Sequence, residues 1–377
     1  MRHGRSAAAL ALIFLAAALL PVCAAPPSPP PTTLKLNEIQ MVGTDASAKL
    51  VPGQGMLSLI RMGGKHDAEA LDFGEPTLTA QLDAGARVLS FDIAYDPDGG
   101  LFKDPAAASM ADELLDESYT AAMSHPGFKV IHVLDVDFKS SCINLKACLS
   151  EVAAWSSAHP GHNAIVIALH VTNRTPMPGA TRPLPFDAAA AAALDKEIQE
   201  VFAATALITP DQVKGQQATL REAVQAGGWP RLTEARGKFL FVLADDAKKT
   251  TLYAGMPGHI GFVTADETSP DAGFIAIDDP LKEAQRITAD VKAGFMVMTL
   301  ADNETTEARD NDTKRRDGAF ASGAQIVLTD FLVPDKKIGP YQVMIPDPRH
   351  VQCDAVIADC TAWLASAPAA QRTAVAH

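Results

Sequence analysis

The sequence is short of positive charge, of cysteine and of long apolar runs. Its 377 residues include 32 Lys and Arg against 45 Asp and Glu, with a formal net charge of −13, and only five cysteines. This excess of negative charge argues against nucleic acid, or a broadly anionic membrane surface, as the main partner. The apolar run at residues 7–20 is too short for a comfortable membrane span, and no later segment is long enough to be one.

The motifs of several common enzyme classes are also missing. No serine lies in the glycine pattern of a nucleophile elbow, and no glycine-rich phosphate-binding loop is present. The short basic cluster at residues 314–316 is interpreted as a solvated helix face, with a phosphate anchor as the less favoured alternative. The chemistry must therefore come from other residues.

The first residues have the three-part pattern of a secretory signal. Arg2 and Arg5 precede the apolar run, and small residues follow it before a proline-rich stretch. Lipidation of Cys23 is an alternative that the bulky Val22 disfavours. We expect a secreted or periplasmic protein with a signal peptide at 1–25, a proline-rich spacer at 26–33, one domain at 34–365 and a flexible tail at 366–377.

Four cysteines remain after the expected cleavage, and they fall into two local pairs. Cys142 and Cys148 are close in sequence, as are Cys353 and Cys360. In an oxidising compartment this pattern predicts two local disulfides. A four-cysteine zinc site is the rival interpretation. It is less favoured because the spacings within the two pairs are wider than the two to four intervening residues that are usual for zinc.

Strand-like apolar segments alternate with helical patterns along the chain. A helix is expected at residues 76–85, another around Trp155, a third at 188–204 capped by Asp187, and a fourth at 220–226. Eight strands are expected at residues 36–42, 87–93, 129–134, 164–169, 237–243, one of 260–263 or 274–277, 295–299 and 324–328. This alternation predicts an α/β protein with a (β/α)8 TIM barrel.

Most of these strands end in an acid or a histidine. In such a barrel the loops that follow the strands converge on one face. The side chains expected there are Asp45, Asp92, His132, His170, Asp245, Asp302 and Asp330. Acids that simply begin loops explain Asp245 and Asp302 well, but they explain two strand-terminal histidines less well.

Several segments, spread in order along the chain, resemble a known family. They include LNEIQMVGT at 36–44, QLDAGAR at 81–87, PGFKVIHV at 126–133, ITPDQVKG at 208–215 and ARDND at 308–312. Together they resemble the secreted, calcium-dependent phosphatidylinositol-specific phospholipase C-like family of the PLC-like phosphodiesterase superfamily. The resemblance runs over residues 36–330 and implies the same barrel.

The resemblance implies a phosphoric diester hydrolase that acts on a phospholipid headgroup or a related phosphodiester. Such chemistry uses two histidines as acid and base and a calcium ion held by oxygen ligands. By resemblance, His132 is the catalytic acid or base, Asp92 is a metal ligand, and Lys238 and Arg309 are candidates for substrate binding. We expect a monomer with at most transient contact with a membrane surface.

The chain departs from the family pattern at most of its site positions. Asp45 and Ala46 stand where the family has its first catalytic histidine and a calcium-binding asparagine, Ser90 and His170 replace two glutamates, and Met298 and Leu300 stand where arginines are common. Only Asp92 and His132 match the pattern.

These departures leave two interpretations open. The site is either rebuilt around Asp45, Asp92, His132 and His170, or it is a relic in a catalytically inactive exported binding protein, a pseudoenzyme. In the rebuilt site Asp45 is both a catalytic candidate and a metal ligand with Asp92 and His170. Two carboxylates and two imidazoles suit zinc, manganese or iron better than calcium.

Overall fold

The computed structural model describes residues 33–172 and 179–366. The expected signal peptide, the spacer except for its last residue, and nearly all of the expected tail lie outside the described residues. Within the described ranges, no helix has both the length and the apolar character that a membrane crossing requires.

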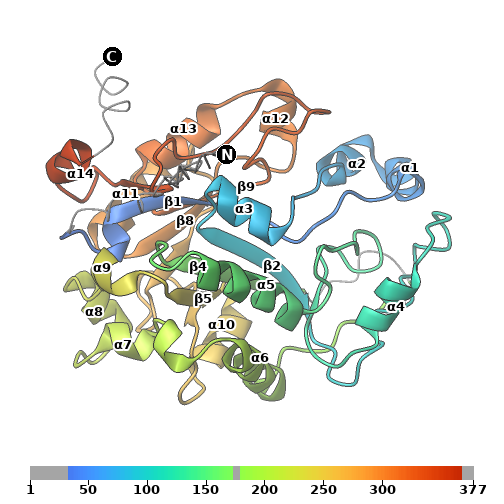
Figure 1. Ribbon diagram of the computed structural model, residues 1–377, viewed down its shortest axis with the longest axis horizontal. Coiled ribbons are helices and arrows are strands. Elements are labelled where there is room, and N and C mark those ends of the chain that lie inside the picture. The colour runs from blue at the N-terminus through green and yellow to red at the C-terminus, as the bar shows by residue number, and fades with distance from the viewer. Residues whose placement is uncertain (1–32, 173–178, 367–377) are drawn as a thin grey trace, which may run out of the picture. The chain divides into compact units, whose positions relative to one another are not determined.

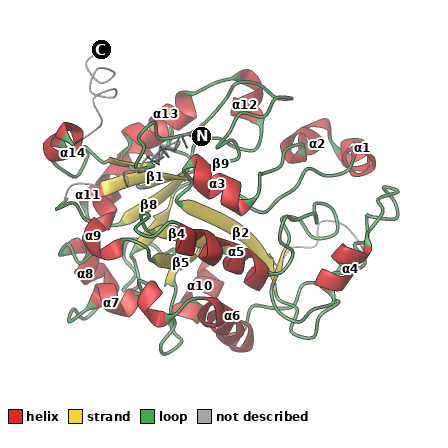
Figure 2. Ribbon diagram, viewed as in Figure 1, coloured by secondary structure: helices red, strands yellow, loops and turns green. Residues whose placement is uncertain are grey.

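Eight parallel strands form a nearly closed barrel with helices around it (Figures 1 and 2). The strands are β1 (Ile39–Thr44), β2 (Val88–Ala94), β4 (Ile165–Val171), β5 (Phe239–Leu243), β6 (Phe262–Val263), β7 (Phe274–Ala276), β8 (Met296–Leu300) and β9 (Ile326–Thr329). They lie in the order β6-β5-β4-β2-β1-β9-β8-β7, and a bridge from Thr264 to Phe274 links the two ends. The predicted α/β class and (β/α)8 barrel are confirmed.

The membership of the barrel differs from the expectation at one strand. Within residues 129–134 only β3 (Lys129–Val130) is a strand, and it pairs antiparallel with the end of β2. Both 260–263 and 274–277, which were expected to compete for one place, contribute barrel strands. Ile131 is buried beside Phe102 and Phe138, outside the barrel. A buried loop therefore shows the same apolar pattern here as a barrel strand would.

The helices follow the strands, and several begin or end at the capping residues that the sequence predicts. Thr77 accepts a hydrogen bond from the Ala80 N–H at the start of α3, and Gly85, at φ +110°, ends it. Asp187 caps α6 through two N–H groups. The helices are α1 (Gln54–Gly63), α2 (Lys65–Leu71), α3 (Leu78–Ala84), α4 (Glu117–Met123), α5 (Leu145–Ala158), α6 (Ala188–Val201), α7 (Pro210–Lys214), α8 (Leu220–Gln225), α9 (Leu232–Ala235), α10 (Ala247–Ala254), α11 (Ala284–Lys292), α12 (Thr306–Asp310), α13 (Lys314–Ala321) and α14 (Thr361–Ala365).

Alternation along β2 sets which side chains enter the barrel. Leu89 and Phe91 pack with the surrounding helices, whereas Val88 packs in the apolar cluster that the barrel strands share. Ser90 and Asp92 have the same parity as Val88 and therefore face the interior. Asp92 is the last of these, so it lies at the carboxyl end of the barrel.

Both predicted disulfides are present. Cys142 pairs with Cys148, and Cys353 pairs with Cys360. The second pair joins β10 (Val351–Cys353), which runs antiparallel to β1, to the start of α14. The alternative four-cysteine zinc site is therefore wrong, because all four sulfur atoms are in disulfides.

Candidate active site

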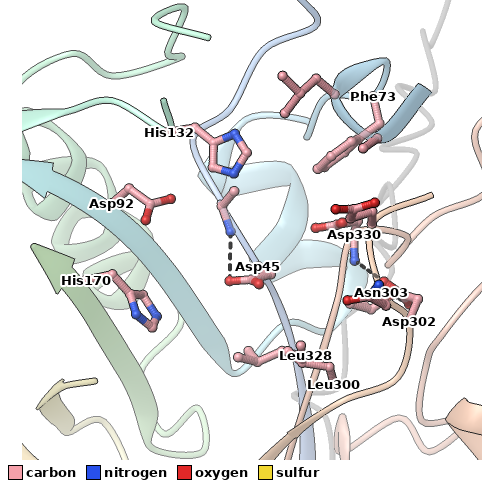
Figure 3. Close-up of a pocket in the computed structure, with 15 residues that line it drawn as sticks. Asp45, Phe73, Asp92, His132, His170, Leu300, Asp302, Asn303, Leu328 and Asp330 are labelled. Carbon is pink, nitrogen blue, oxygen red and sulfur yellow. Dashed lines mark hydrogen bonds between the residues drawn. The ribbon is translucent and has the colours of Figure 1, made fainter. Parts of the chain in front are cut away.

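A cavity of about 310 Å³ opens at the carboxyl ends of the barrel strands (Figure 3). It is lined by Asp45, Ala46, Ala70, Leu71, Phe73, Asp92, His132, His170, Leu300, Asp302, Asn303, Glu304, Leu328, Thr329 and Asp330. All four residues of the predicted rebuilt site are in this set, as are the predicted strand-terminal acids Asp302 and Asp330. Of the predicted strand-terminal residues, only Asp245 is not, because its carboxylate binds Lys249 and the Val171 N–H.

Asp92 and His170 lie side by side on neighbouring strands. The parallel register of β2 and β4 pairs Asp92 with His170. Burial raises the pKa of Asp92 to about 6, against the opposing positive charges of His132 and His170. The Nε2 atom of His170 is buried without a hydrogen-bond partner among the described residues. This imidazole is therefore available to a ligand in the cavity.

His132 is held by a buried ion pair. Its Nδ1 lies 2.8 Å from Oδ2 of Asp137, and the same oxygen lies 3.3 Å from Nζ of Lys49. Burial alone would lower the pKa of His132, but the hydrogen bond to Asp137 and the charges of Asp92 and Asp137 raise it above its ordinary value. With Nδ1 engaged by the carboxylate, Nε2 is the nitrogen left for the cavity.

The loop after β1 places Asp45 between the two sides of the cavity. The N–H of Asp45 donates to the Thr329 carbonyl, and Oδ1 of Asp45 accepts from the N–H of Ala46. Ala46 has φ +47°, a backbone conformation that residues other than glycine rarely adopt. Gln81 on α3 fixes the loop by donating to the Ser47 carbonyl.

Two carboxyl groups, of Asp302 and Asp330, line the other side of the cavity, and the buried Glu75 interacts with Asp302 from outside the lining. Asp302 accepts hydrogen bonds from the Thr329 hydroxyl and the Asp330 N–H, and burial raises the pKa of Asp302 to about 7. Burial and the charge of Asp302 raise the pKa values of Asp330 and of Glu75 well above the ordinary range. Glu75 is 6% exposed, and its Oε1 has no hydrogen-bond partner among the described residues.

The two predicted substrate-binding cations do not line the cavity. Lys238 directly precedes β5, at the amino end of the barrel and therefore opposite the cavity. Arg309 on α12 donates to the Thr305 hydroxyl and to the Glu69 carbonyl, so it ties α2 to the loop after β8. In the 314–316 cluster, Arg315 likewise donates to the backbone carbonyls of Leu300 and Asp278.

The residues present do not fit a calcium ion. Among the described residues, no three His, Cys, Asp or Glu side chains are placed to hold one metal ion. Ala46 and Ser90 supply no carboxylate or amide oxygen, and His170 offers nitrogen where calcium prefers oxygen. Asp45, Asp92 and His170 thus share a cavity without forming a ligand shell.

Sequence reasoning gave no role to four residues that shape this site. Asp137 orients His132, Lys49 pairs with Asp137, Glu75 adds a buried carboxyl group, and Phe73 lines the cavity. Asp137 was noticeable as an acid five residues after His132. No sequence pattern distinguishes the other three from ordinary loop and core residues.

Known proteins resemble this chain in sequence pattern and in fold. The family model for "Phosphoinositide phospholipase C, Ca2+-dependent" matches residues 34–355. An apo crystal form of a calcium-dependent phosphoinositol-specific phospholipase C from Pseudomonas sp., a Gram-negative bacterium, is similar at 15% identity and a TM-score of 0.52, covering 85% of this chain and 95% of that one. The myo-inositol complex of that enzyme gives 15% identity and a TM-score of 0.50, covering 78% and 90%. At this identity the likeness shows the fold alone, and a search of curated proteins found no match.

Proposed function

Because the chain belongs to the family of Ca2+-dependent phosphoinositide phospholipases C, we propose that it is a phosphoric diester hydrolase acting on a phospholipid headgroup or a related phosphodiester. One observation carries this proposal. His132 faces the cavity with its Nδ1 fixed by Asp137, and Asp45 provides a carboxylate in the same cavity.

In the proposed reaction His132 is the general acid and Asp45 the general base. Asp45 takes a proton from the attacking water, the new bond to phosphorus forms, and the bond to the leaving oxygen breaks. The leaving oxygen receives the proton of His132 Nε2. Asp137 keeps the imidazolium oriented and charged, which is what a proton donor near neutral pH needs.

The phosphate would be held by imidazoles. Among the described residues that line the cavity, none is a lysine or an arginine. Among the lining side chains, the imidazoles of His132 and His170 are thus the groups that can carry positive charge toward an anion. The described residues do not assemble the ligand sets predicted for calcium, zinc or manganese, so the proposed reaction uses none of these ions.

A second candidate function is a catalytically silent binding protein. It is favoured by Ala46 and Ser90, which remove the family's calcium ligands, and by the apolar Leu300 on β8. Both functions require the same cavity. They differ only in whether the bound phosphodiester is cleaved.

We also propose that the protein works outside the cytoplasm as a monomer, with transient contact with membranes. The two disulfides support an oxidising compartment. A phospholipid headgroup as substrate would bring the cavity mouth to a lipid surface.

Turnover of bis(p-nitrophenyl) phosphate tests the proposed function most directly. We expect hydrolysis by the wild-type protein and loss of it in His132→Ala, with Asp98→Asn as a control because Asp98 is exposed and does not line the cavity. Wild-type turnover no higher than that of His132→Ala, on this substrate and on phospholipid vesicles, would favour the binding protein.

A further inference from the structure

The cavity has two chemically different sides. Figure 3 shows His132, Asp92 and His170 on one side, and Phe73, Asp302 and Asp330 on the other. The first side offers imidazoles to an anion. The second offers carboxylates and an aromatic ring.

The carboxyl groups on the second side are only partly stabilised as carboxylates from within the protein, because burial and the charge of Asp302 raise the pKa of Asp330. The carboxylate of Asp330 accepts no hydrogen bond from the described residues, and the buried Oε1 of Glu75 also has no partner among them. The nearby Lys49 is committed elsewhere, to Asp137 and to the carbonyls of Leu71 and Phe73. Ionising carboxyl groups in such surroundings is costly, so a cation bound beside them would stabilise their charged forms.

Phe73 adds a surface that suits an organic cation. Its ring lines the cavity, and the ammonium of Lys49 already lies 4.1 Å from the ring centroid. Alkylammonium groups are attracted to aromatic rings, and carboxylates nearby strengthen this attraction. The ring and the carboxylate of Asp330 therefore form two walls of one subsite.

A metal ion fits this side less well than an organic cation. The Asp302 carboxylate already accepts from Thr329 on Oδ2 and from the Asp330 N–H on Oδ1. Among the described residues, no group of three candidate donors could hold a metal. A substrate with a second phosphate group on this side would be repelled by the same carboxylates.

We propose that the cavity takes a phosphodiester whose alcohol carries an ammonium group, of the choline or ethanolamine type, with its phosphate beside His132 and its ammonium between Phe73 and Asp330. This inference rests on the proposed function, because it assigns the substrate of the same site. The alcohol is thereby distinguished from the neutral polyol that the myo-inositol complex of the Pseudomonas enzyme contains.

Binding of the free alcohols tests the inference without requiring turnover. Choline, ethanolamine and myo-inositol would be titrated into the full-length mature protein in EDTA and followed by ligand-observed NMR. We expect choline to bind at least about tenfold more tightly than myo-inositol, and Asp330→Asn and Phe73→Leu each to weaken it roughly fivefold to tenfold. Asp98→Asn, at an exposed residue outside the cavity, should leave choline binding unchanged, and Asp330→Glu should retain it.

Three results would overturn the inference. The first is that the folded wild-type protein does not bind choline, and the second is that it binds myo-inositol more tightly than choline. The third is that calcium or magnesium displaces choline and that the binding of this metal ion is itself lost in Asp330→Asn. Choline binding without turnover of any phosphodiester would support the subsite and count against the hydrolase. Turnover of a phosphodiester without binding of choline or ethanolamine would support the hydrolase and count against the subsite.

Discussion

Asp137 holds His132 through a hydrogen bond of 2.8 Å between Oδ2 and Nδ1, and its own charge is balanced by Lys49 at 3.3 Å. The side chains of Asp137 and Lys49 are fully buried, whereas that of His132 is 26% exposed to the cavity. The buried pair thus acts as a fixed support for one accessible imidazole.

Removing His132 or its support should affect the reaction differently. His132→Ala should lower kcat at least about 100-fold, because a positioned proton donor is lost. Asp137→Asn should lower kcat by about tenfold and also change the pH profile. Since Asp137 raises the pKa of His132, and a general acid must be protonated, activity should then be lost at a lower pH.

The pH profile separates this role from a structural one. Asp135→Asn is the matched control, since Asp135 lies in the same loop but accepts from Ala106 and Thr181. It should alter thermal stability without moving the profile. An Asp137→Asn profile that coincides with the wild type would contradict the assignment of Asp137.

Turnover should be insensitive to calcium. Ala46, Ser90 and His170 do not form the oxygen shell that calcium needs. EDTA should leave hydrolysis of a soluble phosphodiester unchanged, and added calcium should change it by less than about twofold. Activity abolished by EDTA, restored by zinc or manganese and lost again in His170→Ala would instead support the rebuilt metal site.

The barrel and much of the cavity could be predicted from the sequence. Strand-terminal residues such as Asp45, Asp92 and His170 were expected at one mouth because parallel strands share their carboxyl ends, and the cavity contains them. The identity of strand three could not be predicted. Burial of Ile131 in a loop produces the same apolar pattern as burial in the barrel.

The chemistry of the cavity was harder to predict than its location. Lys238 and Arg309 were candidates for substrate binding by resemblance, but neither lines the cavity, because the end of a strand and the direction of a side chain are properties of the fold. The contribution of Glu75 is also three-dimensional. Its charge matters because the fold buries it near Asp302, which is distant in sequence.

The acidic side of the cavity should make the protein less stable as pH rises. Burial raises the pKa of Asp302 to about 7, and burial together with the charge of Asp302 raises the pKa of Asp330 well above its ordinary value. The folded state therefore binds more protons than the unfolded chain between about pH 4 and 7, and stability falls across this window. We expect Tm to be higher at pH 5 than at pH 8.

Asp330→Asn should reduce that dependence. By removing one carboxyl group whose pKa is raised, it should stabilise the protein at pH 8, with little effect at pH 5. Asp98→Asn, on the exposed surface, should leave the pH dependence as it is. Equal Tm changes for the two variants at pH 8 would show that Asp330 carries no unfavourable charge.

Exposed apolar side chains near α1 and α2 should mediate contact with lipid. Met62 on α1 is 84% exposed, and Leu114 is 91% exposed. Helix α1 packs against the 107–113 loop, where Gly55 lies against the Ala111 carbonyl. The next helix, α2, lines the cavity through Leu71. A lipid bound through these side chains would therefore present its headgroup near the mouth.

A double variant tests this lipid contact. Met62→Ser with Leu114→Ser should weaken binding to phosphatidylcholine vesicles at least about tenfold, because burial of each apolar side chain stabilises the bound state by about 1.5–3 kcal/mol when complete. Turnover of a soluble phosphodiester should not change, since neither side chain lines the cavity. Leu364→Ser is the matched control, because Leu364 is 47% exposed on α14, away from α1 (Figure 1). If the control and the double variant weaken vesicle binding equally, the contact is not made through α1, and the headgroup must reach the cavity from another direction.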